Sequence, residues 1–528
     1  MKTLTGMGSL VRFILRRDRI RIPVWLIGLL AFVFISASGV QGVYSNRAEL
    51  ANAARIVENN PAFIAMNGPA QALDTFGGRA AWEIGAIGLS AIALMSMFLM
   101  GRQTRAEEES GRTELVRAAV VGRHAPVTAA LVVVAGVNLL LGALVAASFI
   151  ALDFPAGGSL VMGGAIAAVG LVFAALTAVT AQITEHTRSV YGMTGALLGV
   201  AYVLRAAGDI GNGTLSWLSP IGWAQAARPF ADERWWPLLL ALAFSALLTY
   251  VAFALETRRD VGAGLVPSRP GPPVASHGLT RPLGLALRLQ RGGLIGWTAG
   301  VFLSGLAYGS VGRDIEDLLA DSPEMAEMLA QAGGNLVDSF FATTLLMLAL
   351  IGTGFAIQST LRLKGEENSG RAEPLLATAV PRARWASSHL TVAIAGATLV
   401  VAAGGVGTGL SYGLSIGELN QVPRLLGASL VHLPAVWVFS GIAIALFGLS
   451  PRAATIAWAA LGGSVVIGFF GQLFGLPEWV RELSPFTHIP QVPVTDPTIG
   501  PLVALSALAA ALVAVGLWGF RRRDVASV

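Results

Sequence analysis

The sequence predicts an all-α polytopic membrane protein with about twelve transmembrane helices, arranged as two parallel six-helix repeats. Hydrophobic residues make up 54% of the 528 residues and charged residues only 13%, whereas charged residues are about a quarter of soluble domains. Many apolar runs approach the ~20 residues with which a helix crosses a bilayer. Landmark sequences of the first half return in the same order in the second half. A β-barrel would instead show short alternating strands.

The first half begins with a basic segment, residues 5–21, before its first apolar run. We expect a helix at the inner membrane surface that turns Leu10, Phe13 and Ile14 toward lipid, with an ordinary charged flank as an equal alternative. The first run is predicted to be a retained span rather than a signal peptide, because the second half repeats it far inside the chain. The predicted spans of this half cover residues 22–42, 83–101, 126–152, 159–182, 190–210 and 236–256.

Polar segments join these spans on the predicted outer side. The first contains Asn60-Pro61, typical of a helix cap with a first-turn proline. It also contains Asp74, which we expect, like its match Asp338, to cap the span that follows. A second outer segment, residues 211–236, is rich in Gly, Pro and Trp.

The second half repeats this plan after a proline-rich stretch that suits neither helix nor strand. We divide the chain into a first repeat, 1–262, a cytoplasmic linker, 263–286, and a second repeat, 287–528. Because each repeat has an even number of spans, the two run in the same direction and the transport path is expected between them. The matched landmarks are Leu15, Arg19 and Trp25 with Leu287, Arg291 and Trp297; Asn60-Pro61 with Ser322-Pro323; Asp74-Thr75-Phe76 with Asp338-Ser339-Phe340; Leu218-Ser219-Pro220 with Leu483-Ser484-Pro485; and Arg258-Arg259-Asp260-Val261 with Arg522-Arg523-Asp524-Val525.

The charges are distributed unevenly across the predicted membrane. Most of the 36 Lys and Arg residues fall on one side, which the positive-inside rule assigns to the cytoplasm together with both termini. The net charge of +5 therefore reflects this one-sided distribution, and we expect no nucleic-acid partner. The chain has no Cys, which excludes a disulfide framework and a thiol nucleophile.

A dense charged motif, E-E-x-S-G-R-x-E, follows the second span of each repeat, and its second copy comes 259 residues after the first. In each copy a Glu precedes the Arg by four residues, the favourable order for a helical ion pair of about 0.2–0.5 kcal/mol. The glycine offers a break where the helix can turn along the membrane surface. A solvated helical extension would explain one copy, whereas two copies favour a docking role. The motif residues are Glu107, Glu108, Gly111, Arg112 and Glu114, and Glu366, Glu367, Gly370, Arg371 and Glu373.

These features resemble the permease subunits of ATP-binding-cassette exporters, in particular the fused actinobacterial permeases identified as exporters of polyketide antibiotics. The resemblance rests on the charged segment after each second span, the six-plus-six plan, and Asp74-Thr75-Phe76-Gly77-Gly78 before Trp82-Glu83. It implies that the motif residues form coupling helices that dock into an ATPase subunit. It also implies secondary contacts in the shorter inner loops, at Glu185, Arg188 and Arg452. Pro374 stands where the first copy has Leu115, so we expect the two docking helices to differ in geometry.

The chain lacks the nucleotide-binding sequence G-x-x-x-x-G-K-[ST]. We therefore expect no cofactor in this chain, with ATP and Mg held by a separate nucleotide-binding ATPase that is present in two copies. The six histidines have no close metal-ligand spacing, and no catalytic motif occurs, so neither a metal nor a catalytic residue is predicted. Polar residues inside spans are costly unless they face the interior; Asn138, Arg205 and Asp209 are candidates for a substrate cavity, although Arg205 and Asp209 also have the spacing to pair with each other.

The sequence thus predicts a multi-pass permease of a bacterial cytoplasmic membrane that exports a hydrophobic or amphipathic small molecule, such as an antibiotic. An exporter of lipid is an alternative within the same class. An ion-coupled secondary transporter is the alternative from another class, but it requires carboxylates within the membrane, and those here lie mostly near span ends. A membrane-embedded enzyme would need a catalytic cluster that the sequence lacks.

Overall fold

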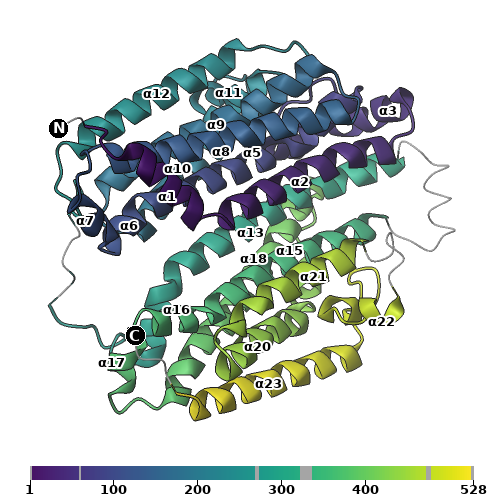
Figure 1. The fold of residues 1–528 in the computed structure, drawn as a ribbon. Coiled ribbons are helices and arrows are strands. Elements are labelled where there is room, and N and C mark those ends of the chain that lie inside the picture. Colours follow the sequence, from purple (N-terminus) through teal and green to yellow (C-terminus); the bar gives the residue numbers. More distant parts are fainter. Residues whose placement is uncertain are drawn as a thin grey trace. The chain divides into compact units, whose positions relative to one another are not determined.

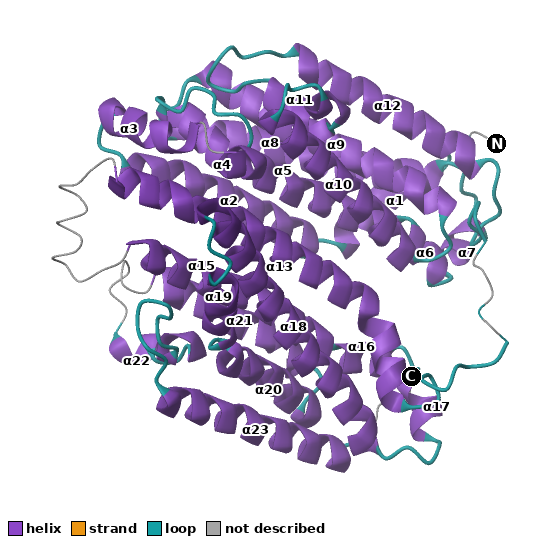
Figure 2. Cartoon of the chain, turned by 180° about the vertical axis from the view of Figure 1, so that it is seen from behind, coloured by secondary structure: helices purple, strands orange, loops and turns teal. Residues whose placement is uncertain are grey.

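The computed structural model describes residues 3–58, 61–267, 271, 273–320, 336–470 and 477–524, and within these ranges every regular element is a helix (Figure 2). The chain forms two compact units, Met1–Gly271 and Pro272–Val528, which Figure 1 shows in purple to teal and in teal to yellow. The division falls within the stretch predicted as a linker. The landmark residues Asn60, Ser322, Pro323 and Val525 lie outside the described residues.

Six helices of the first unit are long and apolar enough to cross a membrane, and each matches a predicted span. They are α2 (Arg21–Val43), α5 (Phe76–Gln103), α8 (Ala125–Ala151), α9 (Ala156–Ile183), α10 (Thr187–Ile210) and α12 (Trp236–Glu256). The shorter helices are α1 (Met7–Arg17), α3 (Arg47–Glu58), α4 (Pro61–Asn67), α6 (Arg105–Glu109), α7 (Arg112–Arg117), η1 (Leu215–Leu218) and α11 (Pro220–Ala226). Pro61 is the first residue of α4, as its sequence predicted.

The core of the first unit lies around α9, which packs against α5, α8 and α12. Gly142 of α8 and Gly163 of α9 face each other, and a Cβ on either would come within 2.4 Å of the other's carbonyl oxygen. Small residues of this kind let two membrane helices approach closely. α5 is kinked at Gly85, whose φ of 35° is left-handed. A side chain there would strike the carbonyl oxygen of Asn67 at 2.5 Å, so α4 and the kink depend on each other.

Among its described residues, the second unit has five helical segments of membrane-spanning length and one further apolar helix that is described as far as Phe470. The long segments are α13 (Pro282–Ala320), α15 (Leu336–Thr360), α18 (Arg382–Ile416), α19 (Gln421–Leu430) joined to α20 (Leu433–Leu449), and α23 (Ile499–Arg522). The shorter elements are α16 (Arg362–Asn368), α17 (Ala372–Leu376), η2 (Ala453–Thr455), α21 (Ile456–Phe470), α22 (Glu478–Arg481) and η3 (Pro485–His488). The eleven long segments confirm a polytopic all-α protein, with α21 in the place of the twelfth expected span.

Two local expectations are corrected by the structure. In α1, Ile14 is buried against the unit and Leu10 is half-buried, so only Phe13 of the three predicted residues is well exposed. The cap of α5 is Thr75, whose side-chain oxygen accepts a hydrogen bond from the backbone N–H of Gly78 at 3.0 Å, whereas Asp74 is exposed. Asp338 lies inside the first turn of α15, where its carboxylate accepts from Arg424 at 2.7 Å.

Candidate functional site

The charged motif of the first unit folds as two short helices separated by a sharp turn. Thr104 leaves the helical conformation at the end of α5, and α6 then covers Arg105–Glu109. Gly111 has a φ of 73°, a left-handed conformation that glycine adopts without a steric penalty, and α7 follows at once. A Cβ on Gly111 would meet nothing within 4 Å, so the backbone conformation alone requires glycine. The predicted break is confirmed.

The motif of the second unit has the same construction. α16 ends at Asn368, Gly370 has a φ of 69°, and α17 begins at Ala372. Pro374 lies in the first turn of α17, where a missing N–H removes no helical hydrogen bond. The helix that follows the glycine is one residue shorter in the second copy, because α17 has five residues and α7 has six.

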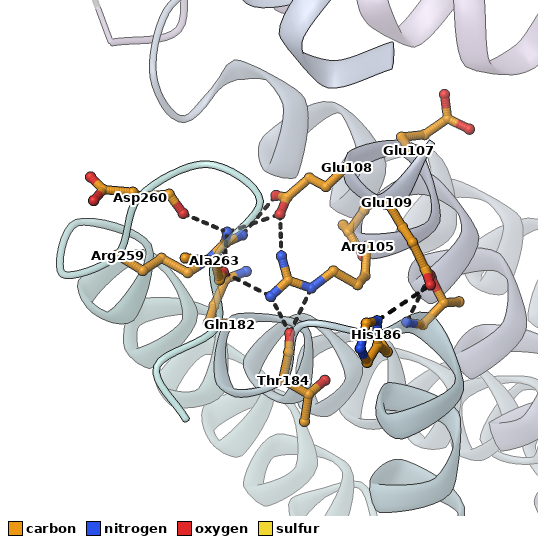
Figure 3. Close-up of polar contacts among 12 residues, drawn as sticks. Arg105, Glu107, Glu108, Glu109, Gln182, Thr184, His186, Arg259, Asp260 and Ala263 are labelled. Carbon is orange, nitrogen blue, oxygen red and sulfur yellow. Dashed lines mark hydrogen bonds and ion pairs between the residues drawn. The ribbon is translucent and has the colours of Figure 1, made fainter. Parts of the chain in front are cut away.

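The second glutamate of the first motif is held by an arginine from the far end of the same unit (Figure 3). Both terminal guanidinium nitrogens of Arg259, which follows α12, donate to the Glu108 carboxylate, at 2.7 and 2.9 Å. Glu108 also accepts from Arg105, one turn earlier in α6. The Glu108 side chain is only 8% exposed and that of Arg259 only 5%. We call this buried, bidentate ion pair the latch of the first unit, because it joins α6 to the end of α12.

Arg105 joins a third segment to this latch. Its side chain is buried and donates to the backbone oxygens of Thr184, between α9 and α10, and of Ala263, after α12, the latter at 2.8 Å. Glu109 approaches the same loop from the other side, accepting from the backbone N–H of Thr187 at 3.1 Å. The motif therefore contacts the ends of α9, α10 and α12 together.

The second unit repeats the latch with the matching residues. Arg523, at the end of α23, donates through two nitrogens to the Glu367 carboxylate, at 2.6 and 2.5 Å, and Glu367 is 4% exposed on its side chain. The Arg523 guanidinium also lies over the rings of Phe447 and Phe520, 4.8 and 5.0 Å from their centroids. Lys364 occupies the position that matches Arg105 and is half-buried. The described residues show no side-chain hydrogen bond from it, so the second latch has one arginine instead of two.

The predicted helical ion pairs Glu108–Arg112 and Glu367–Arg371 are wrong. Arg112 lies 3.4 Å from Glu107, and Arg371 donates to Glu366 at 2.8 Å. The physical reason is the glycine between them, because a left-handed residue ends α6 or α16 and rotates the following arginine away from the helical i, i+4 position. The second glutamate of each motif therefore pairs with the arginine of its latch instead.

The first glutamate of each pair binds the arginine of its own motif and one further arginine. Glu107 pairs with Arg17 of α1 at 2.6 Å as well as with Arg112, and in Figure 3 it points away from Arg105. Glu366 pairs with Arg362 at 2.7 Å and with Arg371. Four of the six glutamates that the sequence singled out in the motifs, those of the two Glu-Glu pairs, are thus mostly buried and already paired.

The remaining motif residues form an exposed tip on each unit. On α7, Arg112 and Glu114 are exposed, and Leu115 is 76% exposed although it is a large apolar residue. On the second unit, Arg371, Glu373 and Pro374 are exposed in the same place. These exposed side chains leave this part of each motif accessible to a partner. We call these two sets the tips.

The sequence is similar to that of a known efflux permease over nearly its whole length. The chain is 43% identical over 527 residues, 99% of its length and 95% of the relative's, to the multidrug efflux system permease protein Rv1217c of Mycobacterium tuberculosis (strain ATCC 25618 / H37Rv). The chain belongs to this permease family. A family model described as the C-terminal domain of the multidrug efflux system permease Rv1217c matches residues 279–521, most of the second unit. The membership confirms the kind of protein that the doubled motif predicted.

The polar residues predicted to face a substrate cavity of the permease make their contacts within the first unit. The Asn138 side chain is fully buried and exchanges hydrogen bonds with Ser96 of α5. The guanidinium of Arg205 donates to the carbonyl oxygens of Ile64 and Ala65, at 3.1 and 2.7 Å. It therefore caps the end of α4, where a helix presents unpaired carbonyls.

Asp209 pairs with Arg205 at 3.4 Å, as their spacing predicted, and also accepts from the Ser216 hydroxyl at 2.5 Å. These contacts hold the segment 211–236 to α10. The inner-loop residues of the permease have mixed surroundings, since Glu185 is half-buried whereas Arg188 and Arg452 are exposed.

Sequence reasoning missed the arginines of the permease's latches, Arg105, Arg259 and Arg523. One signal was available: the sequence Arg-Arg-Asp-Val ends both repeats and was used only as a landmark of the duplication. A charge retained at the same place in both repeats indicates a retained partner, and the two motifs carry an acidic pair at matching places. Nothing in the sequence around Arg105 indicates that it binds backbone oxygens.

Proposed function

We propose that the permease is the membrane subunit of an ATP-driven exporter, and that its two tips dock two copies of a separate ATPase subunit. The observation that carries this proposal is the division of each motif into a buried latch and an exposed tip. Such a division suits a structural element that a partner displaces at its exposed end and that transmits the displacement to the spans at its buried end. ATP and Mg belong to the partner in this proposal.

The latch explains how motion at the tip would reach the membrane. The chain from α7 through Gly111 to α6 is short, and α6 is fixed to the end of α12 through Glu108 and Arg259. It is also fixed to the loop between α9 and α10 through Arg105. A displaced tip would therefore move three spans of its unit together rather than one flexible loop.

The proposed cargo is a hydrophobic or amphipathic small molecule. Rv1217c is named a multidrug efflux permease, and an apolar cargo would suit the apolar spans of this chain, whose whole sequence has a mean hydropathy of +0.67. In the proposed orientation both motifs and both termini face the cytoplasm of a bacterial cell, because the motif side carries most of the Lys and Arg residues.

Co-purification of the full chain with its candidate ATPase tests this function. The informative variants are Arg112→Glu and Arg371→Glu, which reverse a tip charge and leave each latch intact. Each is expected to weaken ATPase binding about tenfold or more, and the double variant to abolish it. Glu418→Lys, a charge reversal at an exposed residue beyond the opposite end of α18, is the matched control and should bind as the unmodified chain does.

The latch variants separate docking from transmission. Glu108→Gln and Glu367→Gln are expected to keep the ATPase bound but to lower substrate-stimulated ATP hydrolysis. Failure of the unmodified chain to bind any ATPase would overturn the proposal in favour of a self-sufficient secondary transporter.

A further inference from the structure

The second unit contains a cavity of about 400 Å³ at the end opposite its latch. Its walls come from the beginning of α15, the described end of α21, the segment around η3, and His432 between α19 and α20. Cavities that bind drug-sized molecules are about 300–1,000 Å³. The space suits a single organic molecule of one to three rings and is too small for a phospholipid with two full acyl chains.

The chemistry of the walls is divided between apolar and hydrogen-bonding surfaces. Leu346, Leu350 and Phe486 provide an apolar side. Arg481 and Ser484 lie on the wall formed around η3, and the lining residues include no carboxylate. A molecule with an apolar body and one negatively charged group would match both surfaces.

Two of the polar lining atoms are buried without partners. The Ser484 hydroxyl belongs to a residue that is 1% exposed, and its oxygen has no hydrogen-bond partner within the described chain. Arg481 as a whole is half-buried, but its Nε atom is also buried and has no hydrogen-bond partner within the described chain. Buried polar atoms are nearly always paired, and leaving one unpaired costs about 1–3 kcal/mol. Nε of Arg481 can only donate a hydrogen bond, whereas a hydroxyl can donate or accept one, so a single acceptor group would satisfy both atoms.

The corresponding place in the first unit is closed. Counted from the repeated sequences Asp-x-Phe and Leu-Ser-Pro, Trp82 matches Leu346 and Ser219 matches Ser484. The cavity beside Trp82 has a volume of only about 50 Å³, and the indole N–H donates to the carbonyl oxygen of Gly68 at 3.0 Å. Ser219 caps α11 by accepting from the backbone N–H of Gly222 at 3.4 Å. The repeated fold can therefore fill this space and satisfy this serine, and the second unit does neither.

We propose that the cavity of the second unit binds an amphipathic organic anion, with its charged group on Arg481 and Ser484 and its apolar body against Leu346 and Phe486. This inference deepens the proposed export function and rests on it, because it names the class of exported solute and assigns its contact residues to one unit. Charge-assisted hydrogen bonds of about 1.5–3 kcal/mol each would give the anion its preference over a neutral molecule of the same shape.

The test uses the full chain in nanodiscs of zwitterionic phosphatidylcholine and two fluorescent probes with one aromatic frame. The anionic probe is 8-anilino-1-naphthalenesulfonate, and the neutral probe is N-phenyl-1-naphthylamine; the signal of empty nanodiscs is subtracted. Saturable binding of the anion is expected. Arg481→Gln should weaken anion binding by about tenfold to 100-fold and change binding of the neutral probe by less than about threefold, while Arg481→Lys should restore most of the anion affinity.

A second variant tests the space itself. Leu346→Trp copies the residue that closes the first unit and should abolish saturable binding of both probes. Arg234→Gln, which removes an exposed arginine in the outer segment of the first unit, is the matched control and should leave both affinities unchanged. Unchanged anion binding in Arg481→Gln, or in a folded Leu346→Trp chain, would overturn the inference.

Failure of this inference is distinguishable from failure of the proposed function. If the unmodified chain and the cavity variants all retain the ATPase on co-purification but bind the probes equally, only the cavity assignment is wrong. If no ATPase binds while Arg481→Gln still selectively loses the anion, the cavity assignment stands and the ATP-driven function falls.

Discussion

The two latches are expected to respond unequally to loss of their arginine. In Arg523→Gln, the buried Glu367 carboxylate keeps no other ion-pair partner in the described chain. Removing one partner of a buried pair typically costs about 3–5 kcal/mol. In Arg259→Gln, Glu108 keeps Arg105, so the expected cost is nearer the ~1.5 kcal/mol of one charged hydrogen bond. The matched substitutions thus differ by about 1.5 kcal/mol or more.

Amide hydrogen exchange on the full chain measures this difference locally. Because 1.4 kcal/mol is a factor of ten in an equilibrium constant, α16 amides should exchange about 100-fold faster in Arg523→Gln. The α6 amides should exchange only about tenfold faster in Arg259→Gln. The double variant Glu367→Gln with Arg523→Gln should lose less local stability than its two single variants lose in sum, because no charge remains buried without a partner. Equal effects in the two units, or strict additivity, would refute the latch as described.

Three further outcomes follow from single residues. Leu115→Asp places a charge on the exposed apolar tip and should lower ATPase co-purification at least tenfold while thermal stability stays unchanged. Leu419→Asp, at an exposed apolar site elsewhere, should change neither co-purification nor thermal stability. Gly111→Ala should cost about 1–2 kcal/mol because the left-handed conformation is unfavourable for alanine, and Gly111→Asn should cost less; a thermal unfolding comparison of the two variants checks the order. Arg205→Met removes two donors from the end of α4 and should speed exchange of α4 amides about 100-fold, and unchanged exchange there would contradict the capping role.

The spans were predictable because their signal is contained in each segment. A run of apolar residues long enough to cross the bilayer requires helix whatever it packs against, and all six predicted spans of the first unit were found. The break at Gly111 was also a local signal, since glycine is the residue that adopts a left-handed turn without penalty.

Partners distant in sequence were not predictable in the same way. Spacing of four residues pointed Glu108 to Arg112, but the true partner, Arg259, lies 151 residues away. Arg205 was considered for a cavity because charged residues in spans are costly, whereas its observed partners are backbone oxygens of α4. Backbone groups carry no sequence signature, so a buried arginine that caps a helix cannot be told from one that faces a cavity.

The duplication gives an internal comparison of which features the fold requires. Both units keep the latch, with the glutamate and the arginine in matching places, although their helices have otherwise diverged. At the opposite end the units differ, since Trp82 fills the first and Leu346 leaves the second open. If the latch only stabilised the fold, one copy could have been replaced by apolar packing at little cost. Retention of both latches beside divergence of the cavities therefore supports the two proposals, that the latches serve as similar input points for an ATPase and that the cavity of the second unit binds the cargo.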